Sequence, residues 1–260
     1  MLPDWLQEIL PGDTAHTWEA IRDVVPGSAY LVGGTALAVH LRHRVSRDLD
    51  FFSSAPMDIP RLRAQLENRG HLAVIQIRRD TLNAQFNGTK IQFLEATDQR
   101  VLEPMIDTEG LRISAVGDLL AMKLRAISGR GELRDYFDLK KIEELANRPV
   151  EEGLGLYLAR YQIANPEQAL LHTIRALAYL DDVADDPFLP ETKQDIHSYW
   201  KNRQQQVMPF IDPSRSVAVG LQPTAPHHQS GEKQERTRNS PPHPPIHEPP
   251  ATLSGPNQSL

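Results

Sequence analysis

Residues 31–52 constrain the fold of this chain more than any other stretch, because they join a strand, a tight turn and a second strand. The apolar run Tyr30–Val32 predicts a buried strand, and it ends at Gly33 and Gly34. Glycines let the backbone approach a phosphate closely, and a helix that begins there offers free N–H donors to an anion. We expect Thr35 to cap this helix.

Two aspartates on the following strand carry the clearest chemical signal. Asp48 and Asp50 are separated by one residue in an alternating segment, so both carboxylates lie on one face of the strand. A hard cation such as Mg²⁺ takes oxygen ligands and usually binds one or two protein carboxylates together with substrate phosphates. The alternative is a solvated strand face whose charge is neutralised by Arg44 and Arg47.

The rest of the chain alternates between helical and strand periodicities, which predicts an α+β protein with a small mixed sheet and helices packed on it. Helices are predicted over residues 14–25, 58–69, 114–127 and 133–145, and strands over residues 72–77, 82–86 and 90–94. Three parts are expected: a first domain (residues 1–150), a helical C-terminal unit (151–212) and a disordered, proline-rich tail (213–260).

Composition excludes several classes of protein. The chain has no cysteine, which rules out a disulfide scaffold, a thiol nucleophile and a cysteine-based zinc site. No apolar run approaches the roughly 18 residues of a membrane span, and the N-terminus lacks a basic signal-peptide start, so we expect a cytoplasmic protein. The net charge of −6 argues against a nucleic-acid coat protein, yet residues 42–79 hold eight arginines against four acids. That stretch either faces a polyanion or is a set of solvated charges.

Three motifs, in order along the chain, resemble a known family. GGTAL begins at Gly33, RVSRDLDFF spans residues 44–52, and DLLAMKLRAISGRGELRDYFDL spans residues 118–139. Together they resemble the AbiEii/AbiGii toxin family over about residues 15–145. The resemblance implies a DNA-polymerase-β-like nucleotidyltransferase fold, an NTP substrate and the toxin role of a type IV toxin–antitoxin system related to the MenT toxins. It also implies a role in phage defence and a cognate antitoxin that acts without a stable complex.

The same resemblance assigns residues by position. The expected nucleotide site comprises Gly33, Gly34, Thr35, Arg44, Ser46 and Lys123. The expected metal ligands are Asp48 and Asp50, which hold Mg²⁺ or, as an alternative, Mn²⁺, and which form the catalytic set with Lys123 and Asp135.

Each of the later residues also has a structural interpretation. Lys123 is alternatively an ordinary exposed lysine on the surface of a helix, which is where most lysines lie. Asp135 and Asp138 are alternatively members of an ion-pair network on their own helix, whose cations would be Arg130, Arg134 and Lys141. The nearby histidines lack metal-ligand spacing and are expected to be structural or surface residues.

A third metal-binding carboxylate is missing from the expected place. Many polymerase-type nucleotidyltransferases take one from a neighbouring strand, and here that strand is IQFLEA, residues 91–96. In this strand, Ile91 and Phe93 face the core. Gln92 and Leu94 face the other way, and neither supplies a carboxylate. Glu95 serves only if the strand ends or bulges before it. The third ligand and the general base therefore stay open.

The leading functional hypothesis is metal-dependent nucleotidyl transfer from an NTP to an acceptor, in particular RNA such as a tRNA end. The alternatives are nucleotidylation of a protein or small molecule, and a catalytically inactive nucleotide-binding module. If the acceptor is RNA, Arg61 and Arg63 are the predicted phosphate contacts, since the apolar residues of their helix define a different face. Arg44 and Arg47 are instead expected to pair with the two metal-binding aspartates.

Overall fold

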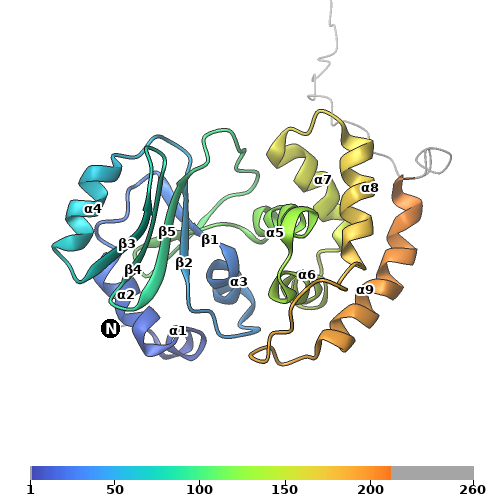
Figure 1. Ribbon diagram of the computed structural model, residues 1–260, viewed down its shortest axis with the longest axis horizontal. Helices are drawn as coiled ribbons and strands as arrows, with labels where there is room; N and C mark the ends of the chain where they lie inside the picture. Colours follow the sequence, from blue (N-terminus) through green and yellow to red (C-terminus); the bar gives the residue numbers. More distant parts are fainter. Residues whose placement is uncertain (1, 212–260) are drawn as a thin grey trace, which may run out of the picture. The chain divides into compact units, whose positions relative to one another are not determined.

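One mixed sheet organises the computed structural model, which describes residues 2–211 (Figure 1). Its strands are β1 (Ala29–Val32), β2 (Leu49–Ser53), β3 (Leu72–Ile77), β4 (Thr81–Phe86), β5 (Thr89–Glu95), β6 (Ile106–Thr108) and β7 (Leu111–Ile113). They lie in the order β3-β4-β5-β2-β1-β7-β6. β2 runs antiparallel to β1 and parallel to β5, whereas β1 runs parallel to β7. The predicted α+β class and mixed sheet are confirmed.

Helices flank both faces of the sheet. They are α1 (Asp4–Ile9), α2 (Gly12–Ile21), α3 (Gly33–Leu41), α4 (Ile59–Glu67), α5 (Val116–Arg130), α6 (Leu133–Ala146), α7 (Val150–Tyr161), α8 (Pro166–Leu177) and α9 (Lys193–Val207), followed by a 3-10 turn, η1 (Met208–Ile211). Within residues 2–211, no helix is long and apolar enough to cross a membrane. The tail predicted over residues 213–260 lies outside the described residues.

One predicted helix cap, at Thr35, and one predicted helix start, at residue 114, are wrong. α3 begins at Gly33, and the residue before it is Val32, because the Thr35 hydroxyl hydrogen-bonds Ser46 and the Asp48 carbonyl instead. α5 begins at Val116 after Ala115, because the Ser114 backbone is still part of the sheet and donates to the Leu31 carbonyl. The short strands β6 and β7 and the short helix α1 were not predicted.

The sheet has a covered face and a partly open face. Buried side chains of β2, β5 and β4 lie in register on the covered face, where Phe51 stacks on Phe93 with ring centroids 4.7 Å apart. Helices α2 and α4 lie against this face, and α4 packs on β4 through Leu62 and Leu66 (Figure 1). On the opposite face, α3 covers β1 and β2, and β1 is consequently buried on both sides.

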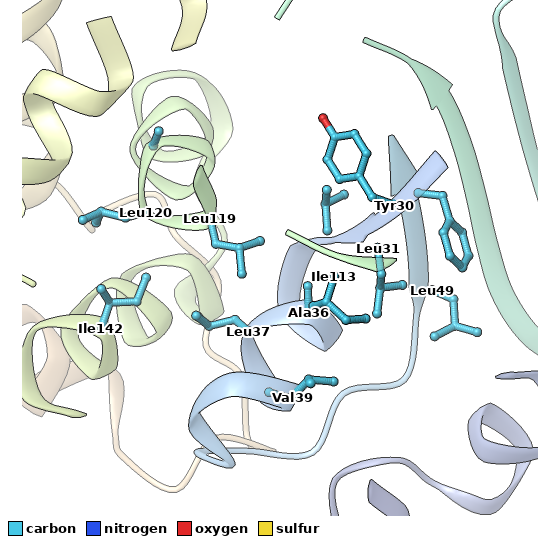
Figure 2. Packing of buried hydrophobic residues seen from close by; sticks show 14 of the residues in the cluster. Tyr30, Leu31, Ala36, Leu37, Val39, Leu49, Ile113, Leu119, Leu120 and Ile142 are labelled. Carbon is cyan, nitrogen blue, oxygen red and sulfur yellow. The ribbon is translucent and has the colours of Figure 1, made fainter. Parts of the chain in front are cut away.

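Helix α3 joins the sheet to the later helices. Its Leu37 lies between Leu31 of β1 and the pair Leu119 and Leu120 of α5, all fully buried (Figure 2). α7 then packs on α5 at Gly153, where a side chain would clash with Leu120. The predicted domain boundary near residue 150 falls between α6 and α7, and the helices on its two sides share one hydrophobic core.

Candidate active site

The two predicted metal ligands lie beside the turn that ends β1. β2 pairs antiparallel with β1 so that Asp50 is opposite Val32, the last residue before Gly33. Gly33 has a φ of +70°, and a Cβ there would lie 2.9 Å from Asp50 Oδ2. Glycine is therefore required at this position both by the left-handed backbone and by the Asp50 carboxylate. Asp48 immediately precedes β2, and its side chain is 29% exposed.

The two carboxylates of this pair repel each other and are only weakly neutralised by the protein. Burial and the neighbouring Asp48 carboxylate raise the pKa of Asp50. The nearest ion-pair partner described is Arg134, whose Nη1 lies 3.8 Å from Asp48 Oδ2. Arg134 also pairs with Glu132, so its charge is shared. The Asp48 and Asp50 carboxylates supply the oxygen ligands that Mg²⁺ prefers, and a bound cation would offset the effects of burial and repulsion that raise the pKa of Asp50. Substrate phosphates would complete the coordination shell of such an ion.

The third carboxylate is absent from the neighbouring strand, as the sequence indicated. Asp50 is in register with Gln92 of β5, which therefore occupies the adjacent position on the metal face. Glu95 lies three residues further along β5, opposite Ser53. Its Oε1 accepts a hydrogen bond from the Met57 backbone N–H at 2.6 Å. Glu95 thus fixes the loop before α4, and no group of three or more His, Asp or Glu side chains with metal-binding geometry occurs in the described part of the chain.

Gly34 has a structural role that its sequence context did not indicate. A Cβ at this position would overlap the Arg44 guanidinium. The glycine therefore makes room for an arginine against the first turn of α3, whose N-terminal N–H groups have no side-chain cap. The free N–H groups of that turn give a partial positive charge next to Asp50, and the Arg44 guanidinium lies against them. Gly34 and Arg44, both predicted to bind the nucleotide, therefore lie against each other.

Thr35 and Ser46 were predicted to contact the nucleotide, and the structure brings them together below the surface. Thr35 Oγ1 lies 2.7 Å from Ser46 Oγ and hydrogen-bonds the Asp48 carbonyl as well. Thr35 is 1% exposed and Ser46 is 7% exposed. The two hydroxyls consequently hold the chain before β2 against α3, and they position Asp48.

Apart from the metal pair, the Asp138 carboxylate on α6 is the centre of a buried ionic cluster. Its oxygens lie 2.7 Å from Lys123 Nζ, 2.7 and 2.8 Å from the Arg44 Nε and Nη2 atoms, and 2.8 Å from His43 Nε2. Lys123 Nζ also lies 2.8 Å from Asp135 Oδ1. We call these five residues the Asp138 cluster.

Charges in the Asp138 cluster stabilise one another. Burial alone would raise the pKa of Asp138, but Lys123, Arg44 and His43 hold it well below its usual range. Burial would lower the pKa of Lys123, but Asp135 and Asp138 raise it. Burial lowers the pKa of His43, so this imidazole is neutral at pH 7 and donates from Nε2. The two cations and two carboxylates then balance, and the cluster is formally neutral.

The cluster corrects several sequence expectations. Arg44 pairs with Asp138 and not with the metal-binding aspartates, and Arg47 lies over the Phe188 ring at 4.8 Å. The cation that reaches the metal pair is Arg134. Asp138 does not pair with Arg134 or Lys141, and Lys123 is buried, not exposed. Asp135 also caps its own helix by accepting the Glu132 N–H at 2.9 Å.

Neither Asp138 nor His43 was predicted as a site residue: Asp138 was considered only as a member of an ion-pair network, and His43 only as a structural or surface residue. Asp138 interrupts a wholly buried run, Tyr136–Leu139, and a charged residue within such an apolar run was the available signal. His43 carried no signal of its own, since its partner is 95 residues away along the chain.

A cavity of about 850 Å³ opens near the metal pair, between the end of α5, the start of α6, α8 and the segment after it. Glu132 lines it and pairs with Arg134, which in turn reaches Asp48. Tyr136 and Tyr179 contribute aromatic walls. The charged lining residues are Glu132, Arg175, Asp182, Asp185 and Asp186, with His172 beside them. The cavity is therefore predominantly acidic.

Comparisons with known proteins agree with the chemistry of this site. The family model described as nucleotidyl transferase AbiEii toxin, type IV TA system, matches residues 21–221. The uncharacterized protein aq_aa25 of Aquifex aeolicus (strain VF5) is 27% identical over 179 residues, which cover 68% of this chain and 82% of that protein.

Two solved structures also match this chain at low sequence identity. A crystal structure from H. pylori, assigned as a nucleotidyltransferase, has a TM-score of 0.49 and 17% identity, and the match covers 80% of this chain and 99% of that one. MenT4, the nucleotidyltransferase toxin Rv2826c of Mycobacterium tuberculosis H37Rv, has a TM-score of 0.41 and 14% identity, with 78% and 83% covered. Neither similarity is close enough to support an argument about chemistry.

Proposed function

The chain belongs to the AbiEii family of nucleotidyl transferase toxins of type IV toxin–antitoxin systems, and we propose that it moves a nucleotide from an NTP to an RNA acceptor such as a tRNA end. An acceptor hydroxyl attacks the α-phosphorus and forms a new phosphodiester bond. The bond between the α- and β-phosphates breaks, pyrophosphate leaves, and the hydroxyl proton passes to a base or to solvent. Both substrates are abundant in the cytoplasm, where we expect the protein to act.

The observation that carries this proposal is the Asp48–Asp50 pair beside the Gly33 turn. Two carboxylates face one side, the pKa of one is raised, and an uncapped helix N-terminus begins next to them. This is the donor set for a divalent cation and a triphosphate at adjacent positions. A bound Mg²⁺ would supply neutralisation of the triphosphate charge, held by Asp48 and Asp50.

The chain's own residues then have separable roles. The first N–H groups of α3 and the Arg44 guanidinium would bind the triphosphate oxygens. Lys123 uses two of its three N–H donors on Asp135 and Asp138, which leaves one for a phosphate oxygen. Because its charge is already balanced within the cluster, we assign Lys123 mainly to positioning α5 and α6 against α3. The antitoxin would act without a stable complex with this chain.

A second function is favoured by one observation. The 850 Å³ cavity beside Arg134 carries four carboxylates against one arginine, a lining that suits a compact or cationic acceptor better than a polyphosphate chain. Nucleotidylation of a small molecule or of a protein side chain is therefore the alternative.

One labelling experiment separates these functions. The purified protein is incubated with each α-labelled NTP and Mg²⁺, in the presence of total RNA or of total protein, and the products are resolved by size. We expect label in RNA from one NTP, and none when Asp48 and Asp50 are both replaced by asparagine or when EDTA is in excess. Label that enters only protein or a small molecule would favour the alternative acceptor, and activity unaffected by EDTA would contradict the metal site.

A further inference from the structure

The open face of the sheet carries a row of side-chain amides that begins at the metal pair. Asp50 of β2 is in register with Gln92 of β5, and Gln92 with Asn83 of β4. Asn83 is in turn in register with Gln76 of β3. Residues paired in register point to the same face, so these four side chains form a line across four strands. With strands about 4.8 Å apart, the line spans about 14 Å.

Two members of this row are already connected, and one has a free end. The Gln76 amide lies 3.0 Å from the Asn83 amide and, at its other end, 2.9 and 3.0 Å from the Arg78 guanidinium. Arg78 can only donate, so the Gln76 oxygen faces it and the Gln76 NH₂ faces the Asn83 oxygen. Among the described residues, the remaining end of the Asn83 amide is buried without a hydrogen-bond partner. That end is then an NH₂ group directed to an acceptor that the protein does not supply.

Beyond the acidic pair at its start, two exposed cations lie along this row. Lys90 of β5 is exposed on the same face, close enough to Asp50 to act on its charge, and Arg78 is exposed at the far end of the row. Within β3, β4 and β5, the one acid is Glu95, which faces the covered side and binds Met57. A row of polar amide side chains between two cations is complementary to a phosphodiester chain with polar bases and riboses.

The arginines that the sequence favoured are on the other side of the sheet. Arg61 and Arg63 belong to α4, which packs on the covered face, and Arg63 pairs with Glu67 at 2.7 Å. A single strand that runs along the open face to the metal pair is therefore separated from these two arginines by the sheet.

We propose that the row Gln92–Asn83–Gln76, with Lys90 and Arg78 beside it, binds the single-stranded end of an RNA acceptor and leads its terminal hydroxyl to Asp48 and Asp50. This inference rests on the proposed function, and it names the surface that recognises the acceptor. The amides bind base edges and ribose hydroxyls, and the two cations bind backbone phosphates. The nucleotide triphosphate remains on the α3 side of Asp50.

The test compares one charge reversal on each face of the sheet. Arg78→Glu is the test variant and Arg61→Glu is its matched control, since both arginines are exposed and neither has an ion-pair partner described. Steady-state transfer to a single-stranded RNA is measured with saturating NTP, together with NTP affinity and the salt dependence of RNA binding. We expect Arg78→Glu to raise the KM for RNA several-fold and to reduce the salt slope by about 1, with NTP affinity unchanged. Arg61→Glu should change neither.

Two further variants protect the result from a folding artefact. Arg78→Lys keeps the charge and should retain most of the RNA affinity, whereas Asn83→Leu removes the free amide and should raise the KM for RNA with little effect on NTP affinity. If Arg78→Glu and Arg61→Glu behave alike while the wild type labels RNA, the surface is wrong and the proposed function stands. If the wild type labels protein or a small molecule and not RNA, the RNA-binding surface and the proposed RNA acceptor are both overturned.

Discussion

Two groups of carboxylates lie on either side of the loop between α3 and β2, and their surroundings are opposite. Asp48 and Asp50 are partly exposed, and the cation nearest to them in the described structure is shared and 3.8 Å away. Asp138 is fully buried and has three nitrogen-bearing partners within 2.8 Å. The pKa of Asp50 is raised, whereas that of Asp138 is lowered.

The difference distinguishes carboxylates that are available to bind a cation from a carboxylate that stabilises the fold. A carboxylate with a raised pKa destabilises the ligand-free fold as an anion, and it is relieved when a cation binds. A carboxylate with a lowered pKa already has its cations and stabilises the fold. In this chain, Arg44 belongs to both regions, because it pairs with Asp138 while its guanidinium lies against Gly34 at the start of α3. The buried cluster therefore fixes the position of the guanidinium that we propose binds the triphosphate.

The largest expected effect is on the buried side. Asp138→Asn leaves Arg44 and Lys123 buried without their shared counter-charge, and we expect a loss of about 3–5 kcal/mol in the free energy of unfolding. Urea unfolding measures it. The matched control is Asp135→Asn, which affects one partner of Lys123 and the cap of α6 at a more exposed position and should cost clearly less. Equal losses in the two variants would mean that Asp138 is not the centre of the cluster.

Substitutions in the Asp48–Asp50 pair should have the reverse effect, a large loss of activity with no loss of stability. Asp50→Asn or Asp48→Asn should reduce nucleotidyl transfer about 100- to 1000-fold, which corresponds to about 3–4 kcal/mol in the activation barrier. Since one of two repelling charges is removed, the melting temperature should stay constant or rise slightly. Asp107→Asn, an exposed carboxylate of β6, is the control and should change neither quantity. A variant at position 50 that loses stability and activity together would assign Asp50 a structural role.

The dependence of stability on pH should carry opposite signs at the two positions. The folded-state pKa of Asp138 is lowered, so its contribution is present above the unfolded pKa of about 4 and is lost as the pH falls. The folded-state pKa of Asp50 is raised, so its ionisation opposes folding as the pH rises above about 4. Urea unfolding between about pH 3 and pH 7 should therefore show that Asp138→Asn flattens the rise in stability with pH, while Asp50→Asn steepens it. Identical pH profiles for the two variants would refute the contrast.

The exposed region was largely predictable from the sequence, because its signals are local. The strand, the glycine turn and the Asp48–Asp50 alternation lie within some twenty consecutive residues, and period and turn chemistry place them without knowledge of the fold. The signals for β4 and β5 are equally local, because the predicted strands over residues 82–86 and 90–94 flank an Asn87-Gly88 pair, which is typical of a hairpin turn. Strand alternation also placed Gln92 where a third carboxylate would be expected, with Glu95 left open, and the register of Gln92 with Asp50 agrees with that placement.

The buried region was not predictable, because its contacts are distant in sequence. Arg44 and Asp138 are 94 residues apart, and only the packing of α6 against α3 brings them together. The strands β6 and β7 have three residues each, too few for a period to be detected. Thr35 was assigned as a cap because threonine commonly caps helices, whereas its tertiary partner Ser46 is contributed by the segment that precedes β2.

The smallest expected effect concerns the link between the two regions, and it decides what Thr35 does. Thr35→Val preserves the shape of the side chain and removes the hydrogen bonds to Ser46 and to the Asp48 carbonyl, so we expect a loss of about 1 kcal/mol in the free energy of unfolding. Because Asp48 is then held less firmly, the Mg²⁺ concentration at half-maximal activity should rise several-fold.

Thr35→Ser keeps the hydroxyl and should restore both quantities, which makes it the matched control. A hydroxyl that bound the triphosphate directly would give another result: Thr35→Val would weaken NTP binding and leave stability and the Mg²⁺ requirement unchanged. The 1% exposure of Thr35 makes the positioning role the expected one, since a triphosphate on the surface of α3 cannot reach a hydroxyl that already lies between α3 and β2.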